Sequence, residues 1–164
     1  MKTKLYLLLA VLSFSFNIKA QDSERTNIAN LIDNWHKAAA DVNQKAYFDF
    51  IADDGIYIGT DSTEIWTKVE FFEWSKQYFE EGKAWNFTCN SRNIHISNDG
   101  LFAWFDELLN SGDITLRGSG TLQKSGDGWK LKHYVLSLPV PNDKFRAVVK
   151  VMNEKVEEKR EREE

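Results

Sequence analysis

Four side chains in the second half of the chain have the chemistry of a reactive site: Asp106, Glu107, Arg117 and His133. A carboxylate or a histidine with a pKa near neutrality can act as a general acid or base, and an arginine can bind an anion. The same groups can equally form structural ion pairs or hydrogen bonds. We therefore treat His133, Glu107 and Asp106 as candidate catalytic residues and ask which of them face the interior.

The segment AWFDELL, residues 103–109, places Asp106 and Glu107 next to each other on a predicted strand. Successive side chains of a strand point to opposite faces. If the small Ala103 packs beneath a helix, Phe105 and Glu107 face inward and Asp106 faces outward. The two carboxylates then do not form one acidic pair, and at most one of them lies in a pocket.

Arg117 begins the segment RGSGTL on the next predicted strand. Simple alternation places Arg117 on the outer face, but Gly118 and Gly120 permit a bulge that leaves its direction open. A buried charge is costly without a partner, so we expect Arg117 to pair with Asp106 or Glu107. The pair is either structural or a clamp for an anionic ligand.

His133 lies on the last predicted strand, where Lys130 and Lys132 alternate with apolar residues. We expect the apolar face to point inward together with His133. His133 is then either a core histidine with a hydrogen-bond partner or an acid/base group in a pocket. This predicted inward face consists of Trp129, Leu131, His133, Val135 and Ser137.

The candidate residues must be positioned by the elements around them. In the first half of the chain the hydrophobic pattern predicts helices. Apolar residues at helical spacing over 28–42 predict the first helix, and QKAYFDFIADD predicts a short second one. A short strand follows over 55–61, and Asp61 and Glu64 are expected to cap the turn after it. Thr67 and Glu70 have the spacing of a capping box, which opens a helix ending near Gly82.

From residue 83 onward the period changes to two, which is typical of strands. The parity changes between Asn90 and Asn93, which predicts a β-bulge there. Three more strands follow over 101–108, 114–124 and 129–138, and Asn142 or Asp143 can cap a final helix. The order predicts an α+β fold, in which a curved antiparallel sheet wraps round the N-terminal helices as a cone, with an extra C-terminal helix.

The first 20 residues have the features of a signal peptide. Lys2 and Lys4 precede an apolar run over 5–16, and Ala20 is a small residue at the expected cleavage site. The run is short for a membrane span, although an uncleaved anchor is the alternative. We therefore expect a signal peptide over 1–20, a domain over 21–141, a helix with a charged tail over 142–164, and a periplasmic or secreted location without a stable membrane anchor.

The charge and the metal-binding residue types exclude several classes of partner. The 21 basic residues, less three lysines of the signal peptide, leave 18 against 25 acidic residues, a net charge of −7. This charge argues against nucleic acid and against an anionic membrane surface. Cys89 is the single cysteine, and His36, His95 and His133 are scattered, so we expect no disulfide, no metal and no cofactor.

Four segments carry a family resemblance: YIGTDSTEIW (57–66), AWFDELL (103–109), RGSGTL (117–122) and GWKLKHYVLSLPVPND (128–143). With them, residues 28–143 resemble the SnoaL-like subgroup of the nuclear transport factor 2-like (NTF2-like) superfamily. That superfamily also contains ketosteroid isomerase and the association domain of calcium/calmodulin-dependent protein kinase. The association domain has a similar spacing to Trp129, His133-Tyr134 and Ser137, but Val135 stands where it has a second histidine.

The resemblance implies a cone-shaped, cystatin-like fold with a pocket between helices and sheet, and frequent homodimerisation through the outer sheet face. It implies no single reaction. Three functions stay open: an exported domain that binds a small, partly apolar molecule; an isomerase, dehydratase or cyclase that uses His133 with Asp106 or Glu107; and a dimerisation or interaction module with a vestigial pocket. The residues expected to line the pocket are Trp35, Tyr57, Trp66, Phe105, Glu107, Arg117 and His133.

Overall fold

The computed structural model describes the backbone of residues 2–126 and 128–163 and the side chains of residues 21–126 and 128–154. The side chains of the predicted signal peptide lie outside this range. In chain order the elements are α1 (Lys2–Ala40), α2 (Gln44–Phe50), β1 (Ile51–Ile58), β2 (Ile65–Thr67), α3 (Lys68–Glu80), β3 (Thr88–Ile96), β4 (Phe102–Ser111), β5 (Ile114–Ser125), β6 (Gly128–Ser137) and α4 (Phe145–Glu163).

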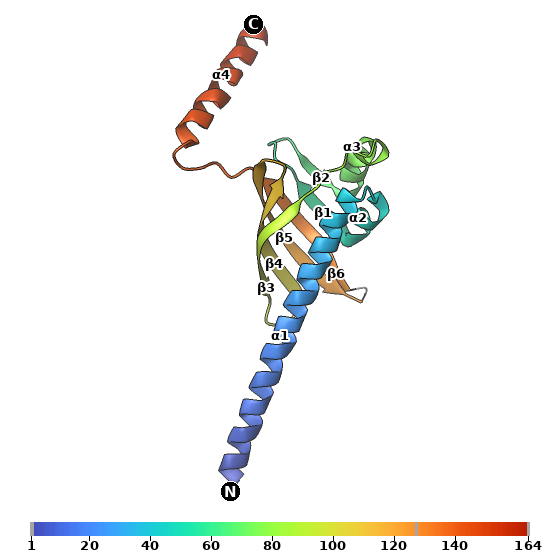
Figure 1. Cartoon of the computed structure of the whole chain (residues 1–164), viewed down its shortest axis with the longest axis vertical. Helices are drawn as coiled ribbons and strands as arrows, with labels where there is room; N and C mark the ends of the chain where they lie inside the picture. Colours follow the sequence, from blue (N-terminus) through green and yellow to red (C-terminus); the bar gives the residue numbers. More distant parts are fainter. Residues whose placement is uncertain (1, 127, 164) are drawn as a thin grey trace.

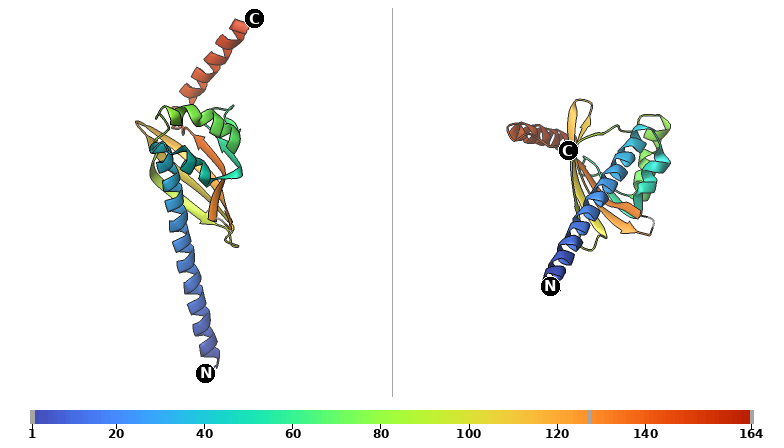
Figure 2. Two further views of the ribbon diagram at one scale, coloured as in Figure 1. Left: turned by 90° about the vertical axis from the view of Figure 1, so that its right-hand side faces the viewer. Right: turned by 60° about the horizontal axis from the view of Figure 1, so that its bottom comes forward.

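The six strands form one curved sheet in the order β2-β1-β6-β5-β4-β3. Neighbouring strands are antiparallel except β1 and β6, which run parallel. The helices α1, α2 and α3 cover one face of the sheet, while α4 extends away from it (Figure 1, Figure 2). The predicted α+β architecture with an extra C-terminal helix is therefore confirmed.

The last four turns of α1 hold the helix against the sheet through one apolar stripe. Ile28, Ile32 and Ala39 are fully buried, and Trp35 is nearly so. The stripe has the spacing of one helix face, which is why the sequence predicted it. Within residues 21–126 and 128–154, no helix is both long and apolar enough to cross a membrane.

The predicted capping box at the start of α3 is present. The Thr67 backbone N–H donates to Glu70 Oε2 at 2.8 Å, and the Glu70 backbone N–H donates to Thr67 Oγ1 at 3.3 Å. The cap fixes where the helix begins, and Phe71 and Phe79 then face the core. The second helix is shorter than predicted, because the chain turns into β1 already at Ile51.

Two irregularities change the parity of long strands. The register of β3 against β4 shifts between Cys89 and Ser91, close to the predicted bulge. A second shift lies in β6, where Leu131 pairs with Leu122 but His133 pairs with Thr121. The extra residue, Lys132, reverses which side chains of β6 face inward after it.

Candidate functional site

Of the two predicted carboxylates, Asp106 and Glu107, only Glu107 is buried in the interior of the domain. The alternation of β4 buries Ala103, Phe105 and Glu107, as predicted, and Glu107 is 1% exposed. Asp106 faces outward, where it accepts a hydrogen bond from Asn93 Nδ2 at 2.9 Å. The two neighbouring carboxylates therefore have different environments, and only Glu107 belongs to the interior.

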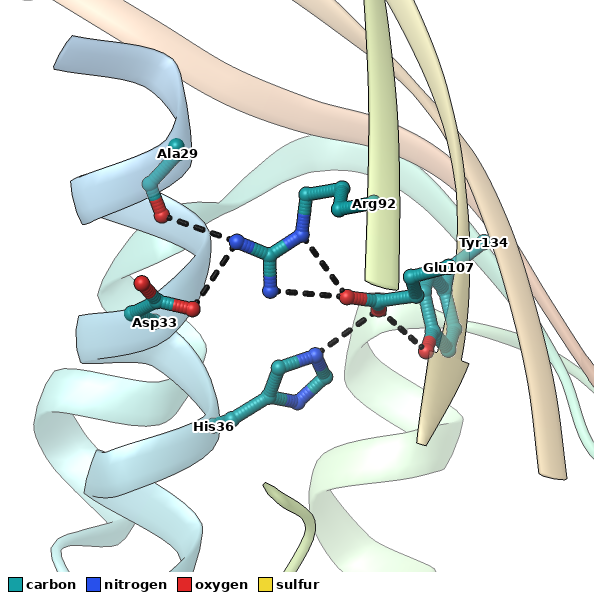
Figure 3. A network of polar contacts seen from close by, with 6 residues as sticks. All are labelled: Ala29, Asp33, His36, Arg92, Glu107 and Tyr134. Carbon is teal, nitrogen blue, oxygen red and sulfur yellow. Dashed lines mark hydrogen bonds and ion pairs between the residues drawn. The ribbon is translucent and has the colours of Figure 1, made fainter. Parts of the chain in front are cut away.

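Three side chains from three other elements converge on Glu107 (Figure 3). His36 Nε2 of α1 lies 2.8 Å from Glu107 Oε1, and the Tyr134 hydroxyl of β6 donates to the same oxygen at 3.0 Å. Arg92 of β3 donates from Nε to Oε2 at 2.9 Å, and its Nη2 lies 2.8 Å from Oε2. We call this group, with Asp33, the Glu107 cluster.

Arg92 connects the Glu107 cluster to the backbone of α1. It lies directly opposite Glu107 in the β3–β4 register, so both side chains share the inner face. Its Nη1 donates to Asp33 Oδ1 at 2.8 Å and to the Ala29 carbonyl at 3.1 Å. The Arg92 side chain is only 6% exposed, so its charge is neutralised by Glu107 and Asp33 rather than by water.

The electrostatics of the cluster keep Glu107 ionised. Burial alone would raise the pKa of Glu107, but the hydrogen bond and charge of His36 and the charge of Arg92 outweigh burial and lower the pKa. An ionised carboxylate only accepts hydrogen bonds, so His36 Nε2 carries a hydrogen. Burial and then the charge of Glu107 raise the pKa of Tyr134, which keeps its hydroxyl a donor.

The predicted inward position of His133 is wrong. His133 is exposed on the outer face of β6, because the extra residue Lys132 shifts the alternation and places Tyr134 inside. Arg117 is exposed as well, opposite Leu108 and Ser137 in the register. The expected pairing of Arg117 with a carboxylate is also wrong within the described residues: Asn93 donates to Asp106, and Arg92 is the cationic partner of Glu107.

The remaining predicted residues divide between the core and a pocket. Trp35 and Phe105 are buried in the core, at 2% and 3% exposure. Tyr57 and Trp66 line a pocket of about 180 Å³ between α3, β1 and the segment before β3, which we call the aromatic pocket. Its lining consists of Tyr57, Gly59, Thr60, Glu64, Trp66, Phe71, Trp74, Trp85, Phe87 and Leu136.

The rings of the aromatic pocket pack on one another. Phe71 stacks on Tyr57 with centroids 4.0 Å apart and on Trp85 at 5.6 Å. The ring centroids of Trp66 and Trp74 lie 4.6 Å apart, and Trp74 is partly exposed to solvent on α3. Such contacts fix the ring orientations without any ligand, so the pocket is preformed.

A second pocket of about 390 Å³ lies next to the first, between α1 and the start of β3. Phe87 lines both pockets, and His36 and Cys89 line the second one. His36 Nδ1 is buried without a hydrogen-bond partner among the described residues. In the described part of the chain, no group of three His, Cys, Asp or Glu side chains is placed to hold a metal ion.

Sequence reasoning missed Arg92 and His36, although each carries a signal. Arg92 has the same strand parity as the inward-facing Ile94, and His36 lies four residues after the buried Ile32 on α1. A charged residue at a core-facing position indicates a buried partner. The pattern identifies such a position but cannot say which distant carboxylate meets it.

A model of the SnoaL-like domain matches residues 28–141, which includes α2, α3, all six strands and the part of α1 that packs on the sheet. The chain belongs to the SnoaL-like domain family. The matched range contains every member of the Glu107 cluster and of the aromatic pocket. No curated protein matches this SnoaL-like chain.

Solved structures place the SnoaL-like domain within the NTF2-like fold. An NTF2-like protein of unknown function from Pseudomonas putida is 18% identical, with 73% of this chain and 89% of that chain covered and a TM-score of 0.62. A protein from Xanthomonas campestris, provisionally assigned as a calcium/calmodulin-dependent protein kinase II association domain, is 20% identical over 71% and 87% of the chains, with a TM-score of 0.56.

A third structure, from Streptomyces avermitilis, is provisionally called a dehydratase of the NTF2-like family. It is 13% identical to this chain, covers 74% of this chain and 99% of its own, and has a TM-score of 0.62. At these identities the likeness concerns the fold alone. The function of the SnoaL-like domain must therefore be argued from its own residues.

Proposed function

We propose that this SnoaL-like domain binds one small, partly apolar molecule in the aromatic pocket. The observation that carries the proposal is the lining itself: six aromatic side chains and the Glu64 carboxylate surround a preformed space next to solvent-exposed Trp74. Apolar walls with a few polar groups are the usual composition of a small-molecule site.

The size of the aromatic pocket limits what can enter it. Pockets for drug-sized ligands have volumes of about 300–1,000 Å³, whereas the aromatic pocket has about 180 Å³. A four-ring substrate of the steroid type does not fit. The ligand is a compact molecule, or one compact group of a longer molecule whose remainder lies outside.

The Glu107 cluster supports binding rather than catalysis. Glu107 is fully buried, and four contacts from Arg92, His36 and Tyr134 already occupy its two oxygens. A general base needs an oxygen within hydrogen-bond reach of a substrate proton. We assign Glu107 to the framework that holds α1 on the sheet and keeps the neighbouring pockets in shape.

A specific observation favours one second candidate, an isomerase, dehydratase or cyclase with His36 as its acid/base group. Glu107 holds Nε2 of His36, so Nδ1, which is buried without a partner in the described residues, is the ring nitrogen left to exchange a proton with a substrate. The ring also lines the second pocket. This reading replaces His133 by His36 and needs a ligand that is chemically changed on incubation, as followed by mass spectrometry.

The experiment for the binding proposal compares two exposed tryptophans. Trp74 lines the aromatic pocket and Trp104 lies on the outer sheet face, where it stacks on His95. In ligand-observed NMR with a set of one-ring and branched aliphatic fragments, Trp74→Ala should lose the fragments that the unchanged domain binds, and Trp104→Ala should retain them. Equal retention in both variants would overturn the proposal and favour an interaction module with a vestigial pocket.

The predicted export is a separate proposal that rests on the sequence of residues 1–20. Cleavage after Ala20 leaves Gln21 as the first residue. The intact mass of the protein isolated from its native cells should correspond to a chain that starts at Gln21. A chain that retains Met1 would contradict cleavage.

A further inference from the structure

We propose that the aromatic pocket recognises an organic cation, of the quaternary or alkylated ammonium class. The inference rests on the proposed function and names the ligand chemistry of the same pocket. It depends on three observations: the ring types that line the pocket, the one charged group among them, and the small volume.

The ring types favour a cation over a neutral apolar group of the same shape. Trp66, Trp74 and Trp85 line the pocket together with Tyr57. The face of an aromatic ring carries negative charge density that attracts a cation, and tryptophan binds cations most strongly. Aromatic cages of this composition are the usual protein sites for quaternary ammonium groups.

The charged group of the lining has the sign that a cation requires. Glu64 is acidic, and none of the ten lining residues in the described part of the chain is basic. Glu64 Oε2 accepts a hydrogen bond from the Asp61 N–H at 3.1 Å, so the carboxylate has a fixed place at the pocket. A side chain at Gly59 would overlap Glu64, which means that the glycine leaves room for the carboxylate.

The raised pKa of Tyr57 agrees with a negative electrostatic potential inside the pocket. Burial is the largest cause that raises the pKa of Tyr57, and the charges of Glu64 and Glu107 raise it further. The same charges that disfavour a tyrosinate favour a bound cation. Glu107 is paired with Arg92 and does not line the pocket, so Glu64 is the carboxylate that a ligand in the pocket would meet, without competition from a lining cation.

The volume favours a compact, weakly hydrated cation. A space of about 180 Å³ holds a head group of the trimethylammonium type with little room left for water. Methyl groups on nitrogen spread the positive charge over an apolar surface, which suits aromatic walls and lowers the cost of leaving water.

The test uses choline and its neutral isostere 3,3-dimethylbutan-1-ol, which have nearly the same shape but differ in charge. Both are titrated into the chain from Gln21 onward at one fixed ionic strength, with tryptophan fluorescence and calorimetry as readouts. We expect choline to bind about tenfold more tightly than the isostere, the difference that cation–π contacts and one carboxylate can supply.

The matched variants are Glu64→Gln and Glu73→Gln, since Glu73 is exposed on α3 and does not line the pocket. Glu64→Gln should reduce the preference for choline several-fold and leave the affinity for the isostere unchanged, whereas Glu73→Gln should change neither. Thermal unfolding of both variants shows whether they are folded.

The remaining outcomes overturn the cation inference, and they differ in whether the proposed function fails with it. Equal affinities for choline and the isostere, or tighter binding of the isostere, would overturn the cation inference and leave the aromatic binding site intact. Binding of uncharged ring fragments without binding of choline would do the same. Failure of choline, isostere and fragments alike would overturn the cation inference together with the proposed function.

Discussion

Arg92 and Glu107 face each other directly across β3 and β4, and the Arg92 Nε donates to Glu107 Oε2 at 2.9 Å in the interior of the domain (Figure 3). Arg92 Nη1 also donates hydrogen bonds to Asp33 Oδ1 and to the Ala29 carbonyl of α1. One cross-strand pair therefore fastens the longest helix to the sheet.

Removing the charge of Glu107 should be strongly destabilising. Glu107→Gln leaves Arg92 with one carboxylate partner instead of two, and breaking a buried ion pair typically costs about 3–5 kcal/mol. The control is Asp106→Asn, the exposed carboxylate next to it, with an expected change within about 0.5 kcal/mol. Urea unfolding measures both, and similar losses would contradict the structural role of Glu107.

The contribution of Glu107 should disappear in acid. Its pKa is lower in the folded chain than the ordinary value of 4.5, so its stabilisation is complete above that value and is lost as the pH falls through the folded pKa. The difference in unfolding free energy between the unchanged chain and Glu107→Gln should be largest at pH 6 and should shrink toward pH 3. A difference that does not depend on pH would argue against an ionised Glu107.

Gly118 leaves the space in which Tyr134 meets Glu107. A Cβ at this position would overlap the Tyr134 hydroxyl and lie 2.9 Å from Glu107 Oε1. Gly118→Ala should therefore cost about 1–3 kcal/mol, as overpacking in a filled core does. At Gly126 a Cβ meets nothing within 4 Å, so Gly126→Ala is the control and should be near neutral. Equal unfolding temperatures of the two variants in calorimetry would contradict the close packing of Tyr134 and Glu107 against Gly118.

The two histidines on opposite faces of the sheet should differ in their effect on stability. His36→Ala removes a hydrogen bond to an ionised carboxylate, which is worth about 1.5–3 kcal/mol. His133→Ala changes an exposed side chain, and we expect a change within about 0.5 kcal/mol. A larger loss of unfolding free energy in His133→Ala than in His36→Ala, measured with urea, would mean that β6 lacks the register shift at Lys132.

Local patterns predicted most of the fold, because each acts over a few residues. The capping box at Thr67, the apolar stripe of α1 and the parity change near Asn90 are all readable without knowing what the element packs against. Strand alternation likewise assigned Glu107 to the interior and Asp106 to the outside. These features depend on periods and turns, which the sequence contains directly.

The error at His133 has a local cause that leaves no local signal. Lys132 is an ordinary exposed strand residue, and the segment KLKHYVL has no glycine or proline to indicate a bulge. After the shift Tyr134 and Leu136 are the buried residues, and they fit the inward face as well as Val135 does. Only the pairing with Thr121 and Leu122 of β5 decides between the two phases.

The Glu107 cluster was beyond sequence reasoning for a different reason. His36 and Arg92 come from elements 71 and 15 residues away from Glu107. Each could be recognised as a polar residue on an apolar face, but the choice of partner depends on how α1 crosses the sheet. That crossing is set by the tertiary packing of large side chains such as Trp35.

The most direct test of the account follows the six indole N–H signals of the protein in a ¹H–¹⁵N spectrum during titration with the fragments that bind. Three tryptophans line the aromatic pocket, Trp66, Trp74 and Trp85, and three lie outside it, Trp35, Trp104 and Trp129. We predict saturable shifts of the first three signals and constant positions of the other three. Shifts confined to Trp35, Trp104 or Trp129 would contradict the assignment of the aromatic pocket as the binding site.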